Sequence, residues 1–294
     1  MKQNQRTHVP VLSEESIRGL NLKKNSVVID ATIDGGGHAS EILKKLGKRG
    51  TLLGLDWDPE MIQRAREKFR DEKRVKLFHL NFQNIRKLTE SLKIRPDAIF
   101  FDLGLSSLQL EASGRGFSFQ RDEPLLMTFD PVTSPDGREF LKTVSKERLE
   151  EILRTYGEEQ GARKIARAII RARAQKEIQT SGELARIIGR VVRRRGRIHP
   201  ATKTFQALRI YLNRELENLE EGLRQAFGVL AKKGEIAVIS FHSLEDRIVK
   251  RTFASLAAEG KARALTRKPL RPGAEEILQN PRARSAKLRI IEKL

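Results

Sequence analysis

The first hundred residues alternate short apolar runs with amphipathic segments, and this alternation limits most strongly what the chain can fold into. Four apolar runs, rich in β-branched or aromatic residues, are predicted to be buried strands: Val27–Ala31, Thr51–Leu55, Val75–His79 and Ala98–Phe101. The segments between them are predicted helices: Ala39–Leu46, Pro59–Phe69 and Asn84–Leu92. Strands joined through helices lie side by side with right-handed crossovers, so the pattern predicts an α/β fold with a parallel sheet.

The alternation stops near Leu108 and returns only near the C-terminus. Three segments between have helical periodicity: Lys146–Tyr156, Arg163–Lys176 and Ser181–Arg194. The predicted elements that follow are one long or broken helix, Thr202–Lys232, the strand Ile236–Ile239, the helix Leu244–Leu256, and the strands Arg263–Arg267 and Lys287–Glu292. The predicted loops are Gly114–Pro135 and Pro269–Pro281. We expect a discontinuous α/β domain, residues 1–108 and 207–294, and an inserted, mostly helical domain, residues 109–206.

Basic residues are concentrated in the predicted insert. The chain holds 58 Lys and Arg against 38 Asp and Glu, a net charge of +20, and 14 basic but only 2 acidic residues lie between Arg163 and Arg209. This excess favours a polyanionic partner, nucleic acid or an anionic membrane surface, with solvated helix faces as the alternative. The candidate contacts to the phosphates of a nucleic acid are Arg163, Lys164, Arg167, Arg193, Arg194, Arg195, Arg197, His199 and Lys203.

The composition disfavours several classes of protein. No apolar run approaches the roughly 18 residues of a membrane span, and the N-terminus lacks the apolar stretch of a signal peptide. Because cysteine is absent, disulfides and thiolate metal sites are excluded, and the five histidines show no ligand spacing. We expect a cytoplasmic protein that binds neither a membrane nor a metal ion.

A triple glycine follows the first predicted strand. Glycine between a strand and a helix lets the backbone approach a ligand closely, although a plain tight turn is the alternative. Asp56, at the end of the second strand, is placed to bind both hydroxyls of a ribose, unless it only caps the next helix. Because the glycines are contiguous and His38 opens the helix, with no arginine-lined phosphate site nearby, S-adenosylmethionine is favoured over a dinucleotide.

Polar side chains follow two other predicted strands. Asp102 ends the fourth strand, and Ser240-Phe241-His242 follows Ile236–Ile239. The carboxyl ends of parallel strands meet at one edge of a sheet, so we expect one composite pocket there. Phe82, just after the third strand, is a candidate to stack on adenine, with ordinary core packing as the equal alternative.

Longer runs of the sequence resemble one known family. They include Gly36-Gly37-His38, Asp102-Leu103-Gly104-Leu105-Ser106-Ser107, Arg115-Gly116-Phe117-Ser118-Phe119, His199-Pro200-Ala201-Thr202-Lys203-Thr204-Phe205 and Ser240-Phe241-His242-Ser243-Leu244-Glu245-Asp246-Arg247. Such runs occur in order over nearly the whole chain, which is identified on them as a member of the ribosomal RNA small subunit methyltransferase H family. The resemblance implies a class I, Rossmann-like S-adenosylmethionine-dependent methyltransferase sheet with a helical insert.

The resemblance also implies a reaction and a partner. The reaction is N4-methylation of one cytidine in the decoding region of 16S ribosomal RNA, and we expect the assembled or nearly assembled small subunit to be the substrate. A homodimer is left open. The cofactor contacts that the resemblance implies are Gly36, Gly37, His38, Asp56, Phe82, Asp102 and Gln109.

The sequence departs from the family pattern at four positions. The family usually carries glycine at Asp34 and serine at Ala39. It also usually carries aspartate at Leu126 and arginine at Thr128, so two opposite charges are missing together here. Because aspartate tolerates a left-handed backbone, we expect the glycine turn to survive. The loop around Leu126 is where substrate engagement is expected to differ.

Methyl transfer to an amine needs a positioned nitrogen and an acceptor for its protons. Asp102 and the Ser106 hydroxyl are the candidate acceptors, and the proline-containing tetrapeptide of many amino-methyltransferases is absent. Phe241 is the first candidate to stack on the target base, ahead of Phe117 and Phe119. His242 is a candidate contact to the base or RNA backbone, or a structural histidine.

Three other functions remain open on the sequence. They are a DNA amino-methyltransferase, a non-catalytic RNA-binding assembly factor that kept the fold, and an NAD-dependent enzyme. The absent proline pair counts against the first, the cofactor residues count against the second, and the contiguous glycines count against the third.

Overall fold

The structure is a computed structural model that describes residues 10–132, 135–193 and 199–294. Three predicted RNA contacts, Arg194, Arg195 and Arg197, lie outside these ranges. The chain divides into two compact units: a sheet unit, Met1–Gly104 with Leu216–Leu294, and an inserted unit, Leu105–Glu215. Each unit is described by itself.

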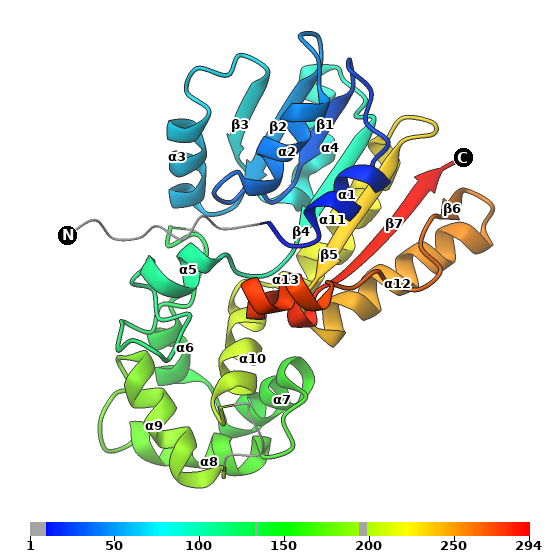
Figure 1. The fold of residues 1–294 in the computed structure, drawn as a ribbon. Helices are drawn as coiled ribbons and strands as arrows, with labels where there is room; N and C mark the ends of the chain where they lie inside the picture. The colour runs from blue at the N-terminus through cyan, green and yellow to red at the C-terminus, as the bar shows by residue number, and fades with distance from the viewer. Residues whose placement is uncertain (1–9, 133–134, 194–198) are drawn as a thin grey trace. The chain divides into compact units, whose positions relative to one another are not determined.

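The sheet unit contains a seven-stranded sheet in the order β3-β2-β1-β4-β5-β7-β6 (Figure 1). The first five strands are parallel to their neighbours, and β7 is antiparallel to both β5 and β6. The strands are β1 Val27–Asp30, β2 Thr51–Asp56, β3 Val75–His79, β4 Ala98–Asp102, β5 Glu235–Ser240, β6 Ala262–Ala264 and β7 Lys287–Lys293. The predicted α/β fold class, a Rossmann-like sheet with a helical insert, is confirmed.

Helices cover both faces of this sheet, because the central strands are apolar on both sides. One face packs against α1 Ser13–Gly19, α2 Gly37–Lys45 and α3 Pro59–Lys68. The other packs against α4 Ile85–Leu92, α11 Glu215–Val229 and α12 Ser243–Ala258. Asp58 caps α3 by accepting the Glu60 N–H, with Pro59 in the first turn, as the sequence indicates.

The inserted unit is helical and has its own apolar core. Its helices are α5 Ser107–Ala112, α6 Gly137–Thr143, α7 Lys146–Gly157, α8 Ala162–Arg173, α9 Ser181–Val191 and α10 Thr202–Leu212. The assignment of this insert to substrate recognition stays a prediction. No helix in the described ranges has the length and apolarity needed to cross a membrane.

The structure decides one alternative in the C-terminal half and differs from the sequence prediction in two details. The segment predicted as one long or broken helix is broken, because Arg214 adopts φ 50° between α10 and α11. The predicted surface loop Pro269–Pro281 instead contains helix α13, Ala274–Gln279, and is followed by a 3-10 turn at Pro281–Ser285. The predicted strand at Arg263–Arg267 is shorter and lies at Ala262–Ala264.

Candidate functional site

Three parallel strands of the sheet unit end in an aspartate. Asp30, Asp56 and Asp102 are the last residues of β1, β2 and β4, and β1 lies between the other two strands. Parallel strands end at the same edge, so the three carboxylates gather at the carboxyl edge of the sheet, as the sequence predicts for Asp56 and Asp102. Such a gathering of like charges needs hydrogen bonds and a nearby cation.

The glycine turn after β1 is tied to the end of β2 by Asp56. The Asp34 N–H donates to Asp56 Oδ2 at 2.9 Å, and the Asp58 N–H donates to Asp56 Oδ1 at 2.9 Å. Asp34 adopts φ 44° and Gly36 φ 72°, so the aspartate does take the left-handed backbone expected of it. A Cβ on Gly36 would lie 2.5 Å from the Phe69 ring, which leaves room only for glycine.

A lysine outside the predicted site also holds this turn. Lys68 Nζ donates to the Gly36 carbonyl at 2.7 Å and to the Gly35 carbonyl at 3.2 Å. The sequence offers no signal for this contact, because Lys68 is simply one of several cations near the end of α3. The turn is therefore fixed from both sides, by a carboxylate on N–H groups and by an ammonium on carbonyls.

His38 lies buried at the start of α2, with hydrogen-bond acceptors on both sides of its ring. Nε2 lies 2.9 Å from the Val11 carbonyl oxygen, and Nδ1 lies 3.3 Å from Asp102 Oδ2. Since a carbonyl and a carboxylate only accept, both ring nitrogens carry protons and His38 is an imidazolium. Burial alone lowers the pKa of His38, but Asp102, the carbonyl of Val11 and the charge of Asp30 raise it above its ordinary value.

Asp30 is almost completely buried beside this cation. Its Oδ1 accepts the Thr32 N–H at 3.2 Å, while Oδ2 has no hydrogen-bond partner among the described residues. Burial raises the pKa of Asp30 to about 7, although His38 and the Thr32 N–H lower it. The sequence does not single out Asp30, because its burial at the strand end is not visible there.

The Asp30→Asn variant is expected to be more stable than wild type at pH 8, by about 2–4 kcal/mol, with a smaller difference toward pH 4. The folded protein holds a proton on Asp30 up to about pH 7, whereas the unfolded chain releases it near 3.8. Wild type therefore loses stability as pH rises through this window, and the variant does not. Thermal unfolding of both proteins from pH 4 to 8 measures this; a difference that stays constant with pH would contradict it.

Asp102 is partly exposed, whereas Asp30 is buried. The side chain of Asp102 is 23% exposed, and its N–H donates to Thr32 Oγ1 at 2.7 Å. Oδ2 faces His38, but Oδ1 has no hydrogen-bond partner among the described residues. A fixed, partly exposed carboxylate is the kind of group that accepts the N–H of an amine substrate.

Two predicted aromatic contacts lie in the sheet unit. Phe82 packs edge-to-face on Phe101 with ring centroids 5.5 Å apart, and a Cβ on Gly222 would lie 2.6 Å from its ring. The ring is half-buried, so core packing is confirmed and stacking on adenine stays a prediction. Phe241 is also half-buried, and its ring lies 3.6 Å from the Cβ position of Gly104, which follows Asp102 by two residues.

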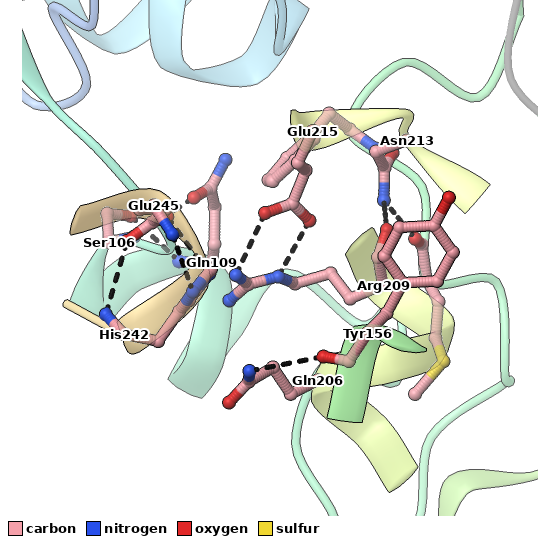
Figure 2. Close-up of polar contacts among 11 residues, drawn as sticks. Ser106, Gln109, Tyr156, Gln206, Arg209, Asn213, Glu215, His242 and Glu245 are labelled. Carbon is pink, nitrogen blue, oxygen red and sulfur yellow. Dashed lines mark hydrogen bonds and ion pairs between the residues drawn. The ribbon is translucent and has the colours of Figure 1, made fainter. Parts of the chain in front are cut away.

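His242 caps helix α12 together with Glu245. The Glu245 N–H donates to His242 Nδ1 at 3.3 Å, and Figure 2 shows these two residues together. The Glu245 carboxylate accepts the N–H groups of Phe241 and His242. This reciprocal cap is the structural alternative considered for His242, and it also positions Phe241. A glutamate three residues after a helix N-cap is the sequence pattern of a capping box, and this pattern points to Glu245.

Ser106 and Gln109 belong to the inserted unit. The Gln109 N–H donates to Ser106 Oγ at 3.1 Å, and the Ser106 N–H donates to Gln109 Oε1 at 3.0 Å, which forms a capping box on α5. Figure 2 also shows, in this unit, the ion pair of Arg209 with Glu215. Arg209 is therefore one cation of the basic stretch with a structural partner. The roles of Ser106 in catalysis and of Gln109 in cofactor binding stay predictions.

The described RNA-contact candidates lie on α8 and near α9 and α10. Arg163, Lys164 and Arg167 are exposed on α8, while its apolar residues face the core of the unit. His199 stacks on Phe119 with ring centroids 4.3 Å apart, and Lys203 donates to the Glu158 carbonyl at 2.9 Å. Arg193 is exposed after α9. Lys203 therefore makes a structural hydrogen bond and His199 a stacking contact, in addition to any contact with RNA.

Leu126 and Thr128 stand in the inserted unit where the family usually carries two opposite charges. Leu126 is half-buried and its carbonyl accepts the Gly137 N–H at 2.9 Å. Thr128 is buried and donates to the Asp130 carbonyl at 3.0 Å. Arg115 donates to the carbonyl of Thr128 at 3.3 Å, so the loop is held without the ion pair.

The chain is similar to known proteins over nearly its whole length. Residues 5–294 match the model of the MraW methylase family. The chain is 45% identical to ribosomal RNA small subunit methyltransferase H of Nitrosomonas europaea, covering 98% of this chain and 97% of that protein. Proteins of the same name from Persephonella marina and Clostridioides difficile are 44% and 40% identical, and each alignment covers 98% of this chain and 99% of the relative.

Proposed function

Because this chain belongs to the MraW methylase family, we propose that it transfers a methyl group from S-adenosylmethionine to N4 of one cytidine in small-subunit (16S) ribosomal RNA. The observation that carries the proposal is Asp102, a partly exposed carboxylate that His38 holds at the carboxyl edge of the sheet. The test is transfer of a labelled methyl group to undermethylated small ribosomal subunits. Transfer to DNA instead would favour the alternative amino-methyltransferase function.

The residues at the carboxyl edge fit the cofactor. Gly36 packs directly against the Phe69 ring, which keeps the glycine turn compact, and Asp56 presents a carboxylate whose oxygens each retain a lone pair beside their N–H bonds. When bound there, S-adenosylmethionine supplies a methyl group activated by a sulfonium. Asp56 would accept the ribose hydroxyls, Phe82 would cover the adenine, and the turn of Gly36, Gly37 and His38 would hold the amino-acid portion.

Asp102 has the central part in the chemistry. The lone pair of a cytosine amine is delocalised into the ring, so an acceptor on its N–H favours a more nucleophilic nitrogen and takes the proton after transfer. His38 fixes the orientation of the Asp102 carboxylate through Oδ2, and the partly exposed carboxylate then accepts from the amine. Placement of the nitrogen in a water-poor pocket supplies most of the remaining rate.

Phe241 is the residue that we assign to the target base. The base must leave any stack to be reached, and an aromatic ring then replaces its lost stacking. Gly104 has φ 94°, and its missing side chain leaves the Phe241 ring accessible from that side. Glu245 fixes the backbone that carries Phe241, so the ring is held in place before substrate arrives.

The exposed side of α8 is assigned to RNA phosphates, because its cations are exposed while the apolar side of the helix is buried in the core of the unit. If about 6–10 phosphates are contacted, a plot of log affinity against log salt has a slope of about −4 to −9. The Arg163→Gln/Arg167→Gln variant is expected to reduce that slope by about 2. Filter binding at several salt concentrations measures it, and a slope near zero for wild type would rule out an RNA role for this unit.

The proposed setting is the cytoplasm, with the assembled or nearly assembled small subunit as substrate. A single cytidine in a folded RNA is best distinguished by its surroundings, because phosphate contacts carry no sequence information. The loop that holds Leu126 and Thr128 is folded without the family's two charges, so we expect the chain to be active.

A further inference from the structure

The loops that precede the five parallel strands are strongly basic. They comprise residues 20–26, 46–50, 69–74, 93–97 and 230–234, which lie directly before β1, β2, β3, β4 and β5. Together they hold eleven basic and three acidic residues, a net charge of +8 out of +20 for the chain. None of these residues belongs to the candidate site.

The fold places these five loops side by side. Because β3, β2, β1, β4 and β5 are parallel neighbours, their amino ends lie at one edge of the sheet, in that order. Backbone bonds join adjacent loops: the Gly47 N–H donates to the Lys24 carbonyl at 2.7 Å, and the Ala231 N–H donates to the Pro96 carbonyl at 2.9 Å. At about 4.8 Å between strands, the edge extends for roughly 19 Å.

Most of this charge is not neutralised within the sheet unit. Arg70 and Arg74 pair with Asp71 and Glu72. The other nine cations are exposed and form no ion pair within the described ranges: Lys23, Lys24, Lys48, Arg49, Lys73, Lys93, Arg95, Lys232 and Lys233. Burial and the neighbouring Arg95 lower the pKa of Lys293, which is the effect expected where cations crowd together.

Acidic groups at this edge offset little of the charge. Glu235 opens β5, and burial followed by the charge of Glu292 raises its pKa to about 7, although Lys23 lowers it. A hollow of about 410 Å³ beside the fourth loop is lined by Arg86, Lys93 and Arg95, with Glu90 as its acidic residue. The edge therefore combines uncompensated charge with a recess that an anionic group can enter.

The opposite edge of the same sheet has a different composition. The loops that follow β1 to β5 contain no Lys or Arg and two acidic residues, Asp34 and Asp58. The basic edge is thus not a general property of the loops in this chain. Its apolar side chains are buried or half-buried, so it lacks the exposed apolar centre of most protein interfaces.

We propose that the amino edge of the sheet is an additional RNA-binding surface, which holds backbone phosphates of the ribosomal RNA. The inference rests on the proposed function, since it takes the same RNA as its ligand. Nine exposed cations along one edge match a polyanion with regularly spaced charges, and phosphate contacts need no apolar surface. This surface positions the substrate and takes no part in the transfer step.

The test compares two pairs of substitutions with equal loss of charge. Lys48→Gln/Arg49→Gln removes two cations from the edge, and the control Lys250→Gln/Arg251→Gln removes two exposed cations from α12. Binding to purified 16S RNA and to small subunits is measured against salt. The edge pair is expected to lower affinity about tenfold at low salt and to reduce the slope by about 2, while the control changes neither. A quadruple variant that adds Lys24→Gln and Lys73→Gln is expected to double the change in slope.

Activity separates this inference from the proposed function. At saturating subunits the edge variants are expected to keep the wild-type kcat and to show a raised KM, with unchanged thermal stability. If wild type methylates the RNA and the edge variants bind both substrates as wild type does, the surface is not used and the inference is wrong. Weakened binding to intact subunits but unchanged binding to naked RNA would identify an acidic protein partner and would also overturn it. Failure of wild type itself to bind or methylate RNA would refute the proposed function.

Discussion

The Asp102→Asn variant should bind S-adenosylmethionine and lose methyl transfer by about 10²–10⁴-fold in kcat, the usual contribution of a positioned acid–base group. The substitution keeps the shape of the side chain but removes the charge that accepts the amine proton. It also removes the partner that holds His38 as an imidazolium, because an amide has one acceptor oxygen instead of two. The measurement is single-turnover transfer at saturating cofactor and subunits, with cofactor affinity determined separately.

The matched control for this prediction is Asp71→Asn. Asp71 is an exposed aspartate that pairs with Arg70, and the variant should keep the wild-type rate. Near wild-type transfer by Asp102→Asn, with cofactor bound normally, would rule out Asp102 as the acceptor. Loss of cofactor binding along with activity would instead assign Asp102 to the cofactor alone.

The Asp56→Ala variant should bind S-adenosylmethionine about 10–150-fold more weakly, equivalent to about 1.5–3 kcal/mol. The carboxylate has two tasks, because it accepts the N–H groups of Asp34 and Asp58 and would also accept the ribose hydroxyls. Its loss therefore removes a ligand contact and loosens the glycine turn. Calorimetric titration measures the affinity, and an unchanged affinity would mean that Asp56 does not hold the ribose.

The same residue predicts a dependence of cofactor affinity on pH. Burial raises the pKa of Asp56 to about 8, although the N–H groups of Asp58 and Asp34 lower it. The ionised carboxylate is the better acceptor for hydroxyls, so wild-type affinity should rise as pH increases from 6.5 to 9. In Asp56→Ala this rise should be absent. That result would assign the rise to Asp56 and not to titration of the cofactor's own groups.

The sequence was sufficient to predict the sheet and the gathering of site residues at its carboxyl edge. The reason is that alternating strands and helices form a parallel sheet, whose strands all end at one edge, so polar residues at strand ends lie there together. The cap of α3 was also predictable, because Asp58 and Pro59 stand at fixed positions of a known pattern.

The interactions that tune the site were not predictable. His38 is an imidazolium because its ring lies between Val11 and Asp102, which are distant in the sequence. Asp30 is perturbed because it is buried, and burial depends on packing from both faces of the sheet. Helix α13 was missed because Pro269–Pro281 is rich in turn residues, whereas Glu276 is held by a contact with the Leu12 N–H.

The basic edge was overlooked for a similar reason. Its cations occur in pairs separated by whole strands and helices, so no single stretch of the sequence has an unusual charge. Only the parallel register of β1 to β5 brings the five loops together. The basic residues of the insert, in contrast, are consecutive enough in the sequence to be recognised, although Arg209 among them is neutralised by Glu215.

The central claim is that this chain methylates N4 of one cytidine in the decoding region of 16S ribosomal RNA. The most direct test incubates the purified protein with labelled S-adenosylmethionine and undermethylated small subunits, then maps the modified nucleotide by mass spectrometry. The account predicts a single N4-methylated cytidine in that region, absent with Asp102→Asn. No transfer while the cofactor is still bound, or a methyl group on another nucleotide, would contradict it.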